Sequence, residues 1–382
     1  MREAIPAGQY DSLWSWVEAS RKLALPDHEL QNVLYPENRV VLKEAVGLET
    51  ERHPNFHETS VEIPKAFVAV LPEGRYWVSE DGTAAVISPD NKLIWDVSMQ
   101  YYLPHARHPV FRKKDLPPAE EIGETVAVMS YAFDSNYYHW MAEVLPRFHL
   151  MERSGIHIDK YIVNSGISSS YQKETLAYVG VPEQSIMQYR NGMHIKAKRL
   201  VVPSMKMYSL LPFIPNSPAP WAVQYLRSEL FGSFVNQRIE GFERIYVSRG
   251  DAKHRRVTNE AQIIEAMTRQ GFAVITPGEL SVADQIRVFA SAEVIVAPHG
   301  AALANLMFCK PNARLLEIFS PNYVNPLYRY ICAQVGVDYY YLIGRGDRVP
   351  ILSGFGDVGY RVEPITVDMD DFLGMLHRVL SG

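Results

Sequence analysis

Apolar and polar positions alternate regularly in the second half of the chain. Five short runs rich in β-branched and aromatic residues have the length of buried strands: residues 244–248, 272–276, 293–298, 314–319 and 338–343. Four amphipathic stretches between them predict helices: residues 259–270, residues 281–291, a segment after Gly300 and one near Asn325. Strands that alternate with helices in this way are typical of a doubly wound, parallel α/β sheet that binds a nucleotide.

The first half shows two different patterns. After about residue 124, apolar runs and amphipathic stretches again alternate: strands at 125–131, 160–165 and 199–204, and helices around 139–152 and 170–179. Before about residue 117 the apolar runs are short and separated by Pro, Gly and Asp-Gly, which indicates a meander or small sheet. Four prolines within residues 211–220 favour a connection between two domains, and residues 368–380 predict a final helix.

Length and composition narrow the class of protein. The 382 residues exceed what one core usually supports, so two domains are expected. A hydrophobic share of 47% is that of an ordinary globular protein, and the net charge of -5 argues against a nucleic-acid partner. Cys309 and Cys332 are too few and too isolated for a zinc site or a disulfide framework. No apolar run is long enough for a membrane helix, so a cytoplasmic protein is expected.

The segment EVIVAPHGAALANLMF carries the sharpest signal. A buried strand ends at Pro298 and His299, Gly300 leaves room beside the backbone, and the small residues Ala301 and Ala302 open a helix. The N–H groups of a first helical turn bind a diphosphate well. A tight strand-to-helix turn with no ligand is the structural alternative.

Two further strand ends add charged candidates. In RIYVSRGDAKHRRVTNE, Arg249 follows a strand, and Arg255 and Arg256 precede a helix, where a guanidinium can bind phosphate. In RLLEIF, Glu317 near a strand end could accept hydrogen bonds from ribose hydroxyls. A solvated basic loop is the alternative for the cluster, and one of the two adjacent arginines is expected to be part of such a loop.

A third candidate lies in the first half, in DSNYYHWMAEVLPRF. Asn136, His139 and Glu143 are spaced by three and four residues, so they share one face if the segment is helical. An imidazole and a carboxylate on one face can act as an acid/base pair. The alternative is a hydrogen-bonded core histidine beside a surface glutamate.

Several familiar sites are not predicted. Asp368 and Asp370 resemble a metal-binding pair, but they precede an amphipathic helix and are interpreted as its N-cap and first-turn acid, so no metal site is expected there. The chain lacks the glycine-rich dinucleotide, P-loop and nucleophile-elbow motifs, which leaves no signal for a nicotinamide enzyme, a P-loop NTPase or an α/β-hydrolase.

Four motifs in order, NYYHWMAEVLPR, YVSRGDAKHRRVTNE, VAPHGAALANLMF and LLEIF, resemble glycosyltransferase family 61, a family that includes capsular polysaccharide biosynthesis proteins. The likeness extends from about Ala66 to Leu342. It implies a GT-B-like α/β fold, with two Rossmann-like domains facing a cleft and a nucleotide sugar held mainly by the C-terminal domain. The resemblance further implies inversion at the sugar, no cofactor beyond the nucleotide-sugar donor, and no required metal.

The resemblance also assigns residues. Glu143 and His139 match the family's acidic position and histidine, and Asn136 falls on the acceptor side. The positions implied for binding the nucleotide sugar are Arg249, Arg256, Asn259, His299, Gly300, Ala301, Asn305 and Glu317. The family's second glycine is replaced by Ala302, which makes backbone approach to a phosphate harder.

Pattern and resemblance together predict four parts. Residues 1–120 form a β-rich extension packed on the first domain, and residues 121–235 form the acceptor-side Rossmann-like domain. Residues 241–365 form the nucleotide-sugar-binding Rossmann-like domain, followed by a C-terminal helix at 366–382.

The hypothesis for the reaction is a single displacement from a nucleoside diphosphate sugar, expected to be a UDP-sugar, to a glycan hydroxyl. Glu143 would be the base, oriented by His139, and the reverse assignment stays open. Arg249, Arg256 and the turn after His299 would stabilise the departing diphosphate. A nucleotide-sugar epimerase and a non-catalytic nucleotide-sugar-binding scaffold are the alternative functions.

The resemblance suggests a surface polysaccharide as the product and a glycan or lipid-linked glycan as the acceptor, with peripheral contact at the inner face of the membrane. The sugar, the linkage and the oligomeric state stay open, as does the role of residues before Ala66.

Overall fold

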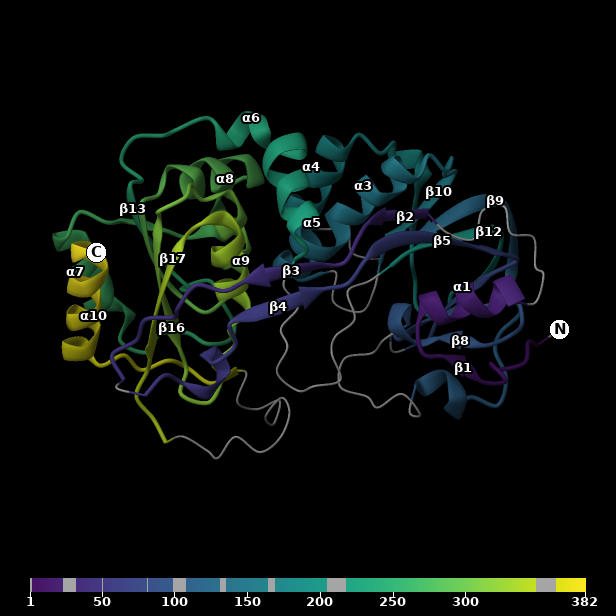
Figure 1. Cartoon of the computed structure of the whole chain (residues 1–382), viewed down its shortest axis with the longest axis horizontal. Helices are drawn as coiled ribbons and strands as arrows, with labels where there is room; N and C mark the ends of the chain where they lie inside the picture. The colour runs from purple at the N-terminus through teal and green to yellow at the C-terminus, as the bar shows by residue number, and fades with distance from the viewer. Residues whose placement is uncertain are drawn as a thin grey trace. The chain divides into compact units, whose positions relative to one another are not determined.

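The computed structural model describes residues 2–22, 32–49, 51–80, 82–98, 108–130, 135–163, 169–204, 218–347 and 362–382 (Figure 1). It is a mixed α/β structure whose contacts divide the chain into two compact units. Unit 1 comprises Met1–Asn38 and Pro64–Met207, and unit 2 comprises Arg39–Ile63 and Tyr208–Gly382. Most of the proline-rich connection expected at 211–220 lies outside the described residues.

Unit 1 is built on one mixed sheet. The strands lie side by side in the order β1 (Gln9–Tyr10), β8 (Leu93–Ile94), β7 (Ala84–Ile87), β6 (Arg75–Val78), β12 (His194–Pro203), β9 (Glu120–Val128), β10 (Lys160–Val163) and β11 (Ile186–Gln188). In addition, β5 (Ala66–Pro72) pairs with β12, and β2 (Asn32–Tyr35) pairs with β5. The long strand β12 pairs in parallel with β9 and antiparallel with β5 and β6. The region expected to be a separate extension therefore shares its sheet with the parallel strands.

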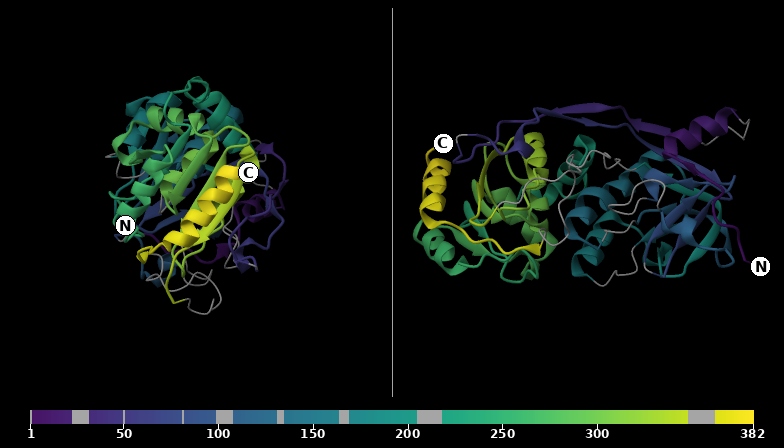
Figure 2. Two further views of the ribbon diagram at one scale, coloured as in Figure 1. Left: turned by 90° about the vertical axis from the view of Figure 1, so that its left-hand side faces the viewer. Right: turned by 90° about the horizontal axis from the view of Figure 1, so that it is seen from below.

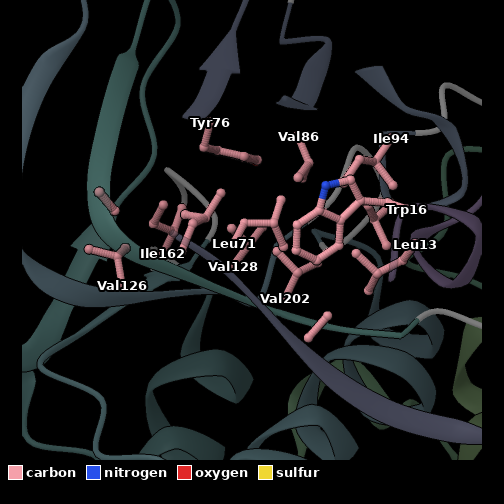
Figure 3. Packing of buried hydrophobic residues seen from close by; sticks show 14 of the residues in the cluster. Leu13, Trp16, Leu71, Tyr76, Val86, Ile94, Val126, Val128, Ile162 and Val202 are labelled. Atoms are coloured by element: carbon pink, nitrogen blue, oxygen red, sulfur yellow. The ribbon is translucent and has the colours of Figure 1, made fainter. Parts of the chain in front are cut away.

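The helices of unit 1 are α1 (Leu13–Lys22), α2 (Tyr137–His139), α3 (Leu145–Ser154) and α4 (Ser170–Val179). Trp16 and Leu13 of α1 are buried against the sheet, together with Leu71, Val128 and Val202 (Figure 3). At about 25 cal/mol per Å² of buried apolar surface, such a cluster is the main stabilising contribution of the unit. Helix α4 has the bounds expected from its pattern, and Gly180 ends it in the left-handed conformation.

Unit 2 holds a five-stranded sheet in which neighbouring strands pair in parallel. The order is β14 (Ala273–Ile275), β13 (Arg244–Val247), β15 (Val294–Pro298), β16 (Arg314–Phe319) and β17 (Asp338–Ile343). In chain order this is 2-1-3-4-5, the doubly wound arrangement, which reverses direction between β13 and β15. The alternation of strands and helices predicted for the second half is confirmed.

Helices cover both faces of this sheet. Helices α7 (Glu260–Arg269) and α10 (Met369–Ser381) share one apolar cluster with the sheet, and α10 lies along the strands (Figure 2). The other helices are α8 (Val282–Ser291) and α9 (Leu327–Val335), which both pack on a 3₁₀ helix, Ala301–Phe308. Phe372 and Met375 of α10 are fully buried, so the C-terminal helix is part of the core of unit 2.

Before that sheet the chain forms two short helices, α5 (Pro220–Gln224) and α6 (Gly232–Val235), joined by a π-helical segment. None of the helices in the described part of the chain has both the length and the apolar character needed to cross a membrane.

Residues 39–63 belong to unit 2, although the pattern places them in the N-terminal extension. They carry the two-stranded sheet of β3 (Asn38–Val41) and β4 (Ser60–Ile63). The buried guanidinium of Arg329 on α9 donates to the carbonyls of Lys43, Phe56 and Glu58 at 2.7–3.0 Å. A buried arginine needs such acceptors, and this segment supplies them from far away in the sequence.

Candidate functional site

The carboxyl ends of β13 and β15 form the switch point of the unit 2 sheet. Ligands of doubly wound sheets bind where the strand order reverses, outside the carboxyl ends of the strands. Arg249 follows β13, and His299 and Gly300 follow β15. The structure therefore brings three of the expected donor-binding residues to the place where the topology favours a ligand.

Arg249 packs directly on Gly300. A Cβ atom added to Gly300 would lie 1.7 Å from Nη1 of Arg249, so only glycine leaves space for the guanidinium. Nε donates to the carbonyl of Arg255 at 3.2 Å, and Nη2 donates to the carbonyl of His254 at 2.8 Å. Burial, followed by the nearby charge of Arg255, lowers the pKa of Arg249 to about 10. The guanidinium is thus held by carbonyls beside a second positive charge.

Arg255 is the second cation of this site. Its φ of 52° lies in the left-handed region, and its Nε donates to the carbonyl of His299 at 3.3 Å. Its guanidinium lies 5.2 Å from the ring centroid of Tyr323. Arg256, the arginine favoured from the sequence, is exposed and donates to the carbonyl of Gly250. Of the two adjacent arginines, the structure brings Arg255 to His299.

His299 and Glu317 form a buried pair. Nδ1 of His299 lies 2.5 Å from Oε1 of Glu317, and the hydroxyl of Tyr339 donates to Oε2 at 2.6 Å. Burial raises the pKa of Glu317 well above its ordinary value. Burial, followed by the charges of Arg255 and Arg249, lowers the pKa of His299 well below its own. Glu317 was expected to accept ribose hydroxyls, but it is fully buried and both its oxygens are already engaged.

The turn after His299 differs in detail from expectation. Residues Ala301–Phe308 form a 3₁₀ helix rather than an α-helix, and Gly300 stands at its N-cap. The first N–H groups of a 3₁₀ helix have no partner within the helix, as in an α-helix. Ala301 and Ala302 are half-buried at this position. The expected turn is therefore present in a tighter form, and anion binding by its N–H groups stays a prediction.

Two asparagines assigned to the nucleotide sugar hold the protein chain instead. Asn259 donates to the carbonyl of Val367 at 2.9 Å and accepts from its N–H at 3.1 Å. Asn305 is fully buried and donates to Oε1 of Gln285 at 2.9 Å. These amides fix the two segments that flank the site, and their role in binding the nucleotide sugar stays a prediction.

The acid/base candidate of unit 1 lies on a continuous helical segment. Nδ1 of His139 is 3.0 Å from Oε2 of Glu143, and their side chains are 16% and 15% exposed. Burial lowers the pKa of His139 to about 4. Asn136, the acceptor-side candidate, is the N-cap of α2, and its Oδ1 accepts from the N–H of Tyr138 at 2.9 Å. The predicted shared face of His139 and Glu143 is present.

A π-helical turn, Trp140–Val144, separates α2 from α3. Pro146 lies shortly after this turn within the continuous helical segment, and because proline has no N–H, one intrahelical hydrogen bond is missing here. Extra turns of this kind occur often at functional sites because they change the direction of a side chain. Glu143 lies within this turn, and Arg147 after it donates to the carbonyl of Met129 at the end of β9.

Sequence reasoning missed three residues at these sites, Glu260, Tyr339 and Ser320, and it named Arg255 without choosing it over Arg256. Glu260 accepts from the hydroxyls of Tyr246 and Ser248 and from the N–H of Arg249, so it fixes the turn after β13. Tyr339 holds Glu317, and Arg255 holds His299. Ser320, directly after β16, is fully buried, and its hydroxyl has no hydrogen-bond partner among the described residues. An acid in a first helical turn could have suggested Glu260, but Tyr339 is one of three adjacent tyrosines that the pattern does not distinguish.

Within the described ranges, no group of three or more His, Cys, Asp and Glu side chains is arranged to hold a metal ion.

Part of the chain matches the model of a known family. Residues 137–316 match the family model described as Glycosyltransferase 61. The matched segment includes His139 and Glu143 in unit 1 and Arg249, His299 and Gly300 in unit 2, and it ends one residue before Glu317. No curated protein matches the chain.

Proposed function

We propose that this chain, which is a glycosyltransferase, binds the diphosphate of a nucleotide-sugar donor at the switch point of unit 2 and transfers the sugar to a hydroxyl group of a glycan acceptor. The observation that supports this most strongly is the position of Arg249. Its guanidinium lies on Gly300, is held by two carbonyls and stands beside Arg255. Two like charges fixed together at a ligand-binding edge favour an anion between or beside them.

The leaving group needs positive charge as the bond to the sugar breaks. Arg249 and Arg255 supply two guanidiniums, and the first N–H groups after Gly300 add the positive end of a short helix. Both guanidiniums donate to backbone carbonyls that hold them in place, which reduces the reorganisation needed during reaction. The proposal therefore includes no metal ion, and activity should persist in the presence of a chelator.

The acceptor hydroxyl needs a base, which we assign to the His139 and Glu143 pair. Because the pKa of His139 is lowered, its imidazole is neutral above about pH 4, and Nδ1–H donates to the carboxylate of Glu143. The lone pair of the ring is then on Nε2. This arrangement favours His139 as the base and Glu143 as its orienting partner, the reverse of the order preferred from the sequence.

The finer parts of the proposal rest on the resemblance of the four motifs. They are a uridine diphosphate sugar as donor, inversion at the anomeric carbon, and a surface polysaccharide acceptor, free or lipid-linked, used at the cytoplasmic face of the membrane. They also include a GT-B arrangement of the two units.

The experiment is thermal stabilisation of the purified chain by uridine, guanosine, cytidine and adenosine diphosphates and their sugars. Arg249→Ala should lose the shift, whereas Arg256→Ala, the matched control on the exposed neighbour, should keep it. A chain that responds to no nucleotide, or that responds equally after Arg249→Ala, would contradict the donor site. Sugar isomerisation without an acceptor would indicate an epimerase, and binding without turnover over an acceptor panel would indicate a scaffold.

A further inference from the structure

The carboxyl group of Glu317 lies in an environment that disfavours a charge. Its strand, β16, is apolar on both sides of Glu317, from Leu315 to Phe319, and the side chain of Glu317 is 0% exposed. An ionised carboxylate without water is costly unless its partners offset the lost hydration. The carboxyl group of Glu317 is therefore either ionised and stabilised by nearby positive charge, or protonated and neutral.

Each of the two oxygens of the Glu317 carboxyl group has a hydrogen-bond partner. Oε2 accepts from the hydroxyl of Tyr339, which is itself buried and keeps its proton because burial raises its pKa well above the ordinary value. Oε1 lies 2.5 Å from Nδ1 of His299, a distance that fits a strong bond with one hydrogen between the two atoms. The remaining questions are which of these two atoms carries that hydrogen and whether Nε2 of the ring carries a second one.

The surroundings favour the oxygen. On the imidazole side, the charges of Arg249 and Arg255 disfavour an imidazolium, and the ring of His299 stacks on Phe319. On the carboxyl side, the titratable neighbours from α9 are Tyr328 and Cys332, which are buried and neutral because burial raises their pKa. The two guanidiniums thus disfavour a positive charge on the ring, and the groups named beside the acid, Tyr328, Cys332 and Tyr339, are neutral.

We propose that Glu317 is a carboxylic acid whose O–H donates to Nδ1 of His299, so that His299 carries its own hydrogen on Nε2, and that Tyr339 is the positioning residue that holds the acid in this orientation. The inference rests on the proposed function, because it assigns Nε2–H as a neutral donor to a phosphate oxygen at the switch point. A bare lone pair at Nε2 would repel that oxygen. A buried acid kept neutral so that it can donate is an established device of enzyme sites.

The direct test reads the tautomer without any ligand. Nitrogen NMR of the protein labelled at histidine distinguishes a ring protonated at Nε2 from one protonated at Nδ1, and the His299→Gln spectrum assigns the signals. We expect the Nε2–H form at pH 7 in the unaltered protein. The Nδ1–H form would overturn the inference, and because no nucleotide is present, that result would leave the donor-site proposal standing.

Glu317→Gln is the matched variant, since its amide copies the neutral acid. The NH2 group can donate to Nδ1 of His299 while the amide oxygen accepts from Tyr339, so the Nε2–H form and the Kd for inorganic pyrophosphate should be retained within about threefold. A change to the Nδ1–H form together with a loss of tenfold or more would show that the ionised carboxylate is the required partner.

Tyr339→Phe tests the positioning role. Without the phenol the acid loses one of its two anchors, and we expect the KM for the donor to rise about tenfold with kcat changed less than twofold. The nitrogen spectrum of the variant should show a mixture of the two tautomers. An unchanged KM with an unchanged spectrum would exclude Tyr339 from this role, whatever its contribution to stability.

Discussion

The two units each hold a histidine whose Nδ1 faces a glutamate, and the two pairs differ in sequence spacing, distance and exposure. In unit 1, His139 and Glu143 lie four residues apart on one helical segment, 3.0 Å from each other and 16% and 15% exposed. In unit 2, His299 and Glu317 come from neighbouring strands, lie 2.5 Å apart and are 5% and 0% exposed. The same two kinds of side chain are thus partly exposed to solvent in unit 1 and buried away from solvent in unit 2.

The difference indicates a division of tasks. A pair that reaches solvent can exchange a proton with a substrate, as a general base must. A pair sealed among aromatic rings cannot do so readily, but it can fix one tautomer and one ring orientation. We therefore assign proton transfer to the unit 1 pair and the orientation of a ligand contact to the unit 2 pair.

The largest expected effect comes from removing the proposed base. His139→Gln should lower kcat by about 10² to 10⁴, because the acceptor hydroxyl loses its proton acceptor. Steady-state transfer kinetics provide the measurement, and pyrophosphate affinity serves as the control, which should not change. Retention of full kcat would remove His139 from the mechanism, and a larger loss in Glu143→Gln would restore Glu143 as the base.

For the stability of the fold, a substitution in the unit 2 pair should have a larger effect than the same substitution in the unit 1 pair. Glu317→Leu leaves His299 Nδ1 and the Tyr339 hydroxyl buried without partners, and we expect the free energy of unfolding in urea to fall by roughly 2–5 kcal/mol. The matched variant Glu143→Leu removes a partly solvated carboxylate and should cost less than about 1 kcal/mol. Equal losses would show that the two pairs are not different in kind.

The unit 1 pair should also make stability depend on pH. The pKa of His139 is about 4 in the folded protein and 6.5 when unperturbed. Between these values the unfolded chain binds a proton that the folded protein does not, so stability is full above pH 6.5 and falls as the pH decreases toward 4. The loss is at most roughly 3 kcal/mol. Denaturation of His139→Gln should show a shallower fall, and an identical pH profile would contradict the lowered pKa.

A smaller effect, on ligand affinity, is expected from a substitution at Gly300, which directly follows His299 of the buried pair. Gly300→Ala places a methyl group on the guanidinium of Arg249, while its φ of -177° leaves the backbone unstrained. We expect pyrophosphate to bind about tenfold more weakly, about 1.4 kcal/mol, as titration calorimetry can measure. Gly374→Ala, at an open position on α10, is the control. Unchanged binding would mean that the position of Arg249 is unimportant.

The sheet of unit 2 could be predicted from the sequence because its strands are buried on both faces. A strand of this kind is a continuous apolar run such as VIVAP, and the helices between such runs are amphipathic. Helix α4 was predicted for the same reason. The clustering of Arg249, His299 and Gly300 follows from the rule that parallel strands end at one edge.

Other features depend on contacts between distant parts of the chain. The local pattern of residues 39–63 is that of short strands, and nothing in it indicates that Arg329 needs their carbonyls. Arg255, rather than Arg256, contacts His299, and the backbone of Arg255 is in the left-handed region, which the sequence pattern does not indicate. Glu317 was interpreted as a strand-end acid that accepts hydrogen bonds from ribose hydroxyls, because the strand pattern does not reveal that it pairs with His299.

The acceptors of Arg329 also have a consequence for synthesis of the chain. Arg329 follows Lys43 by 286 residues, so on the ribosome the carbonyls emerge long before the guanidinium that they bind. At about 5–20 residues per second, this interval lasts roughly 15 to 60 s, during which residues 39–63 have no finished unit to join. A fragment beginning at residue 208 would lack these carbonyls altogether and is not expected to fold. The second half of the chain therefore completes its fold only with a segment that was translated before most of the first half.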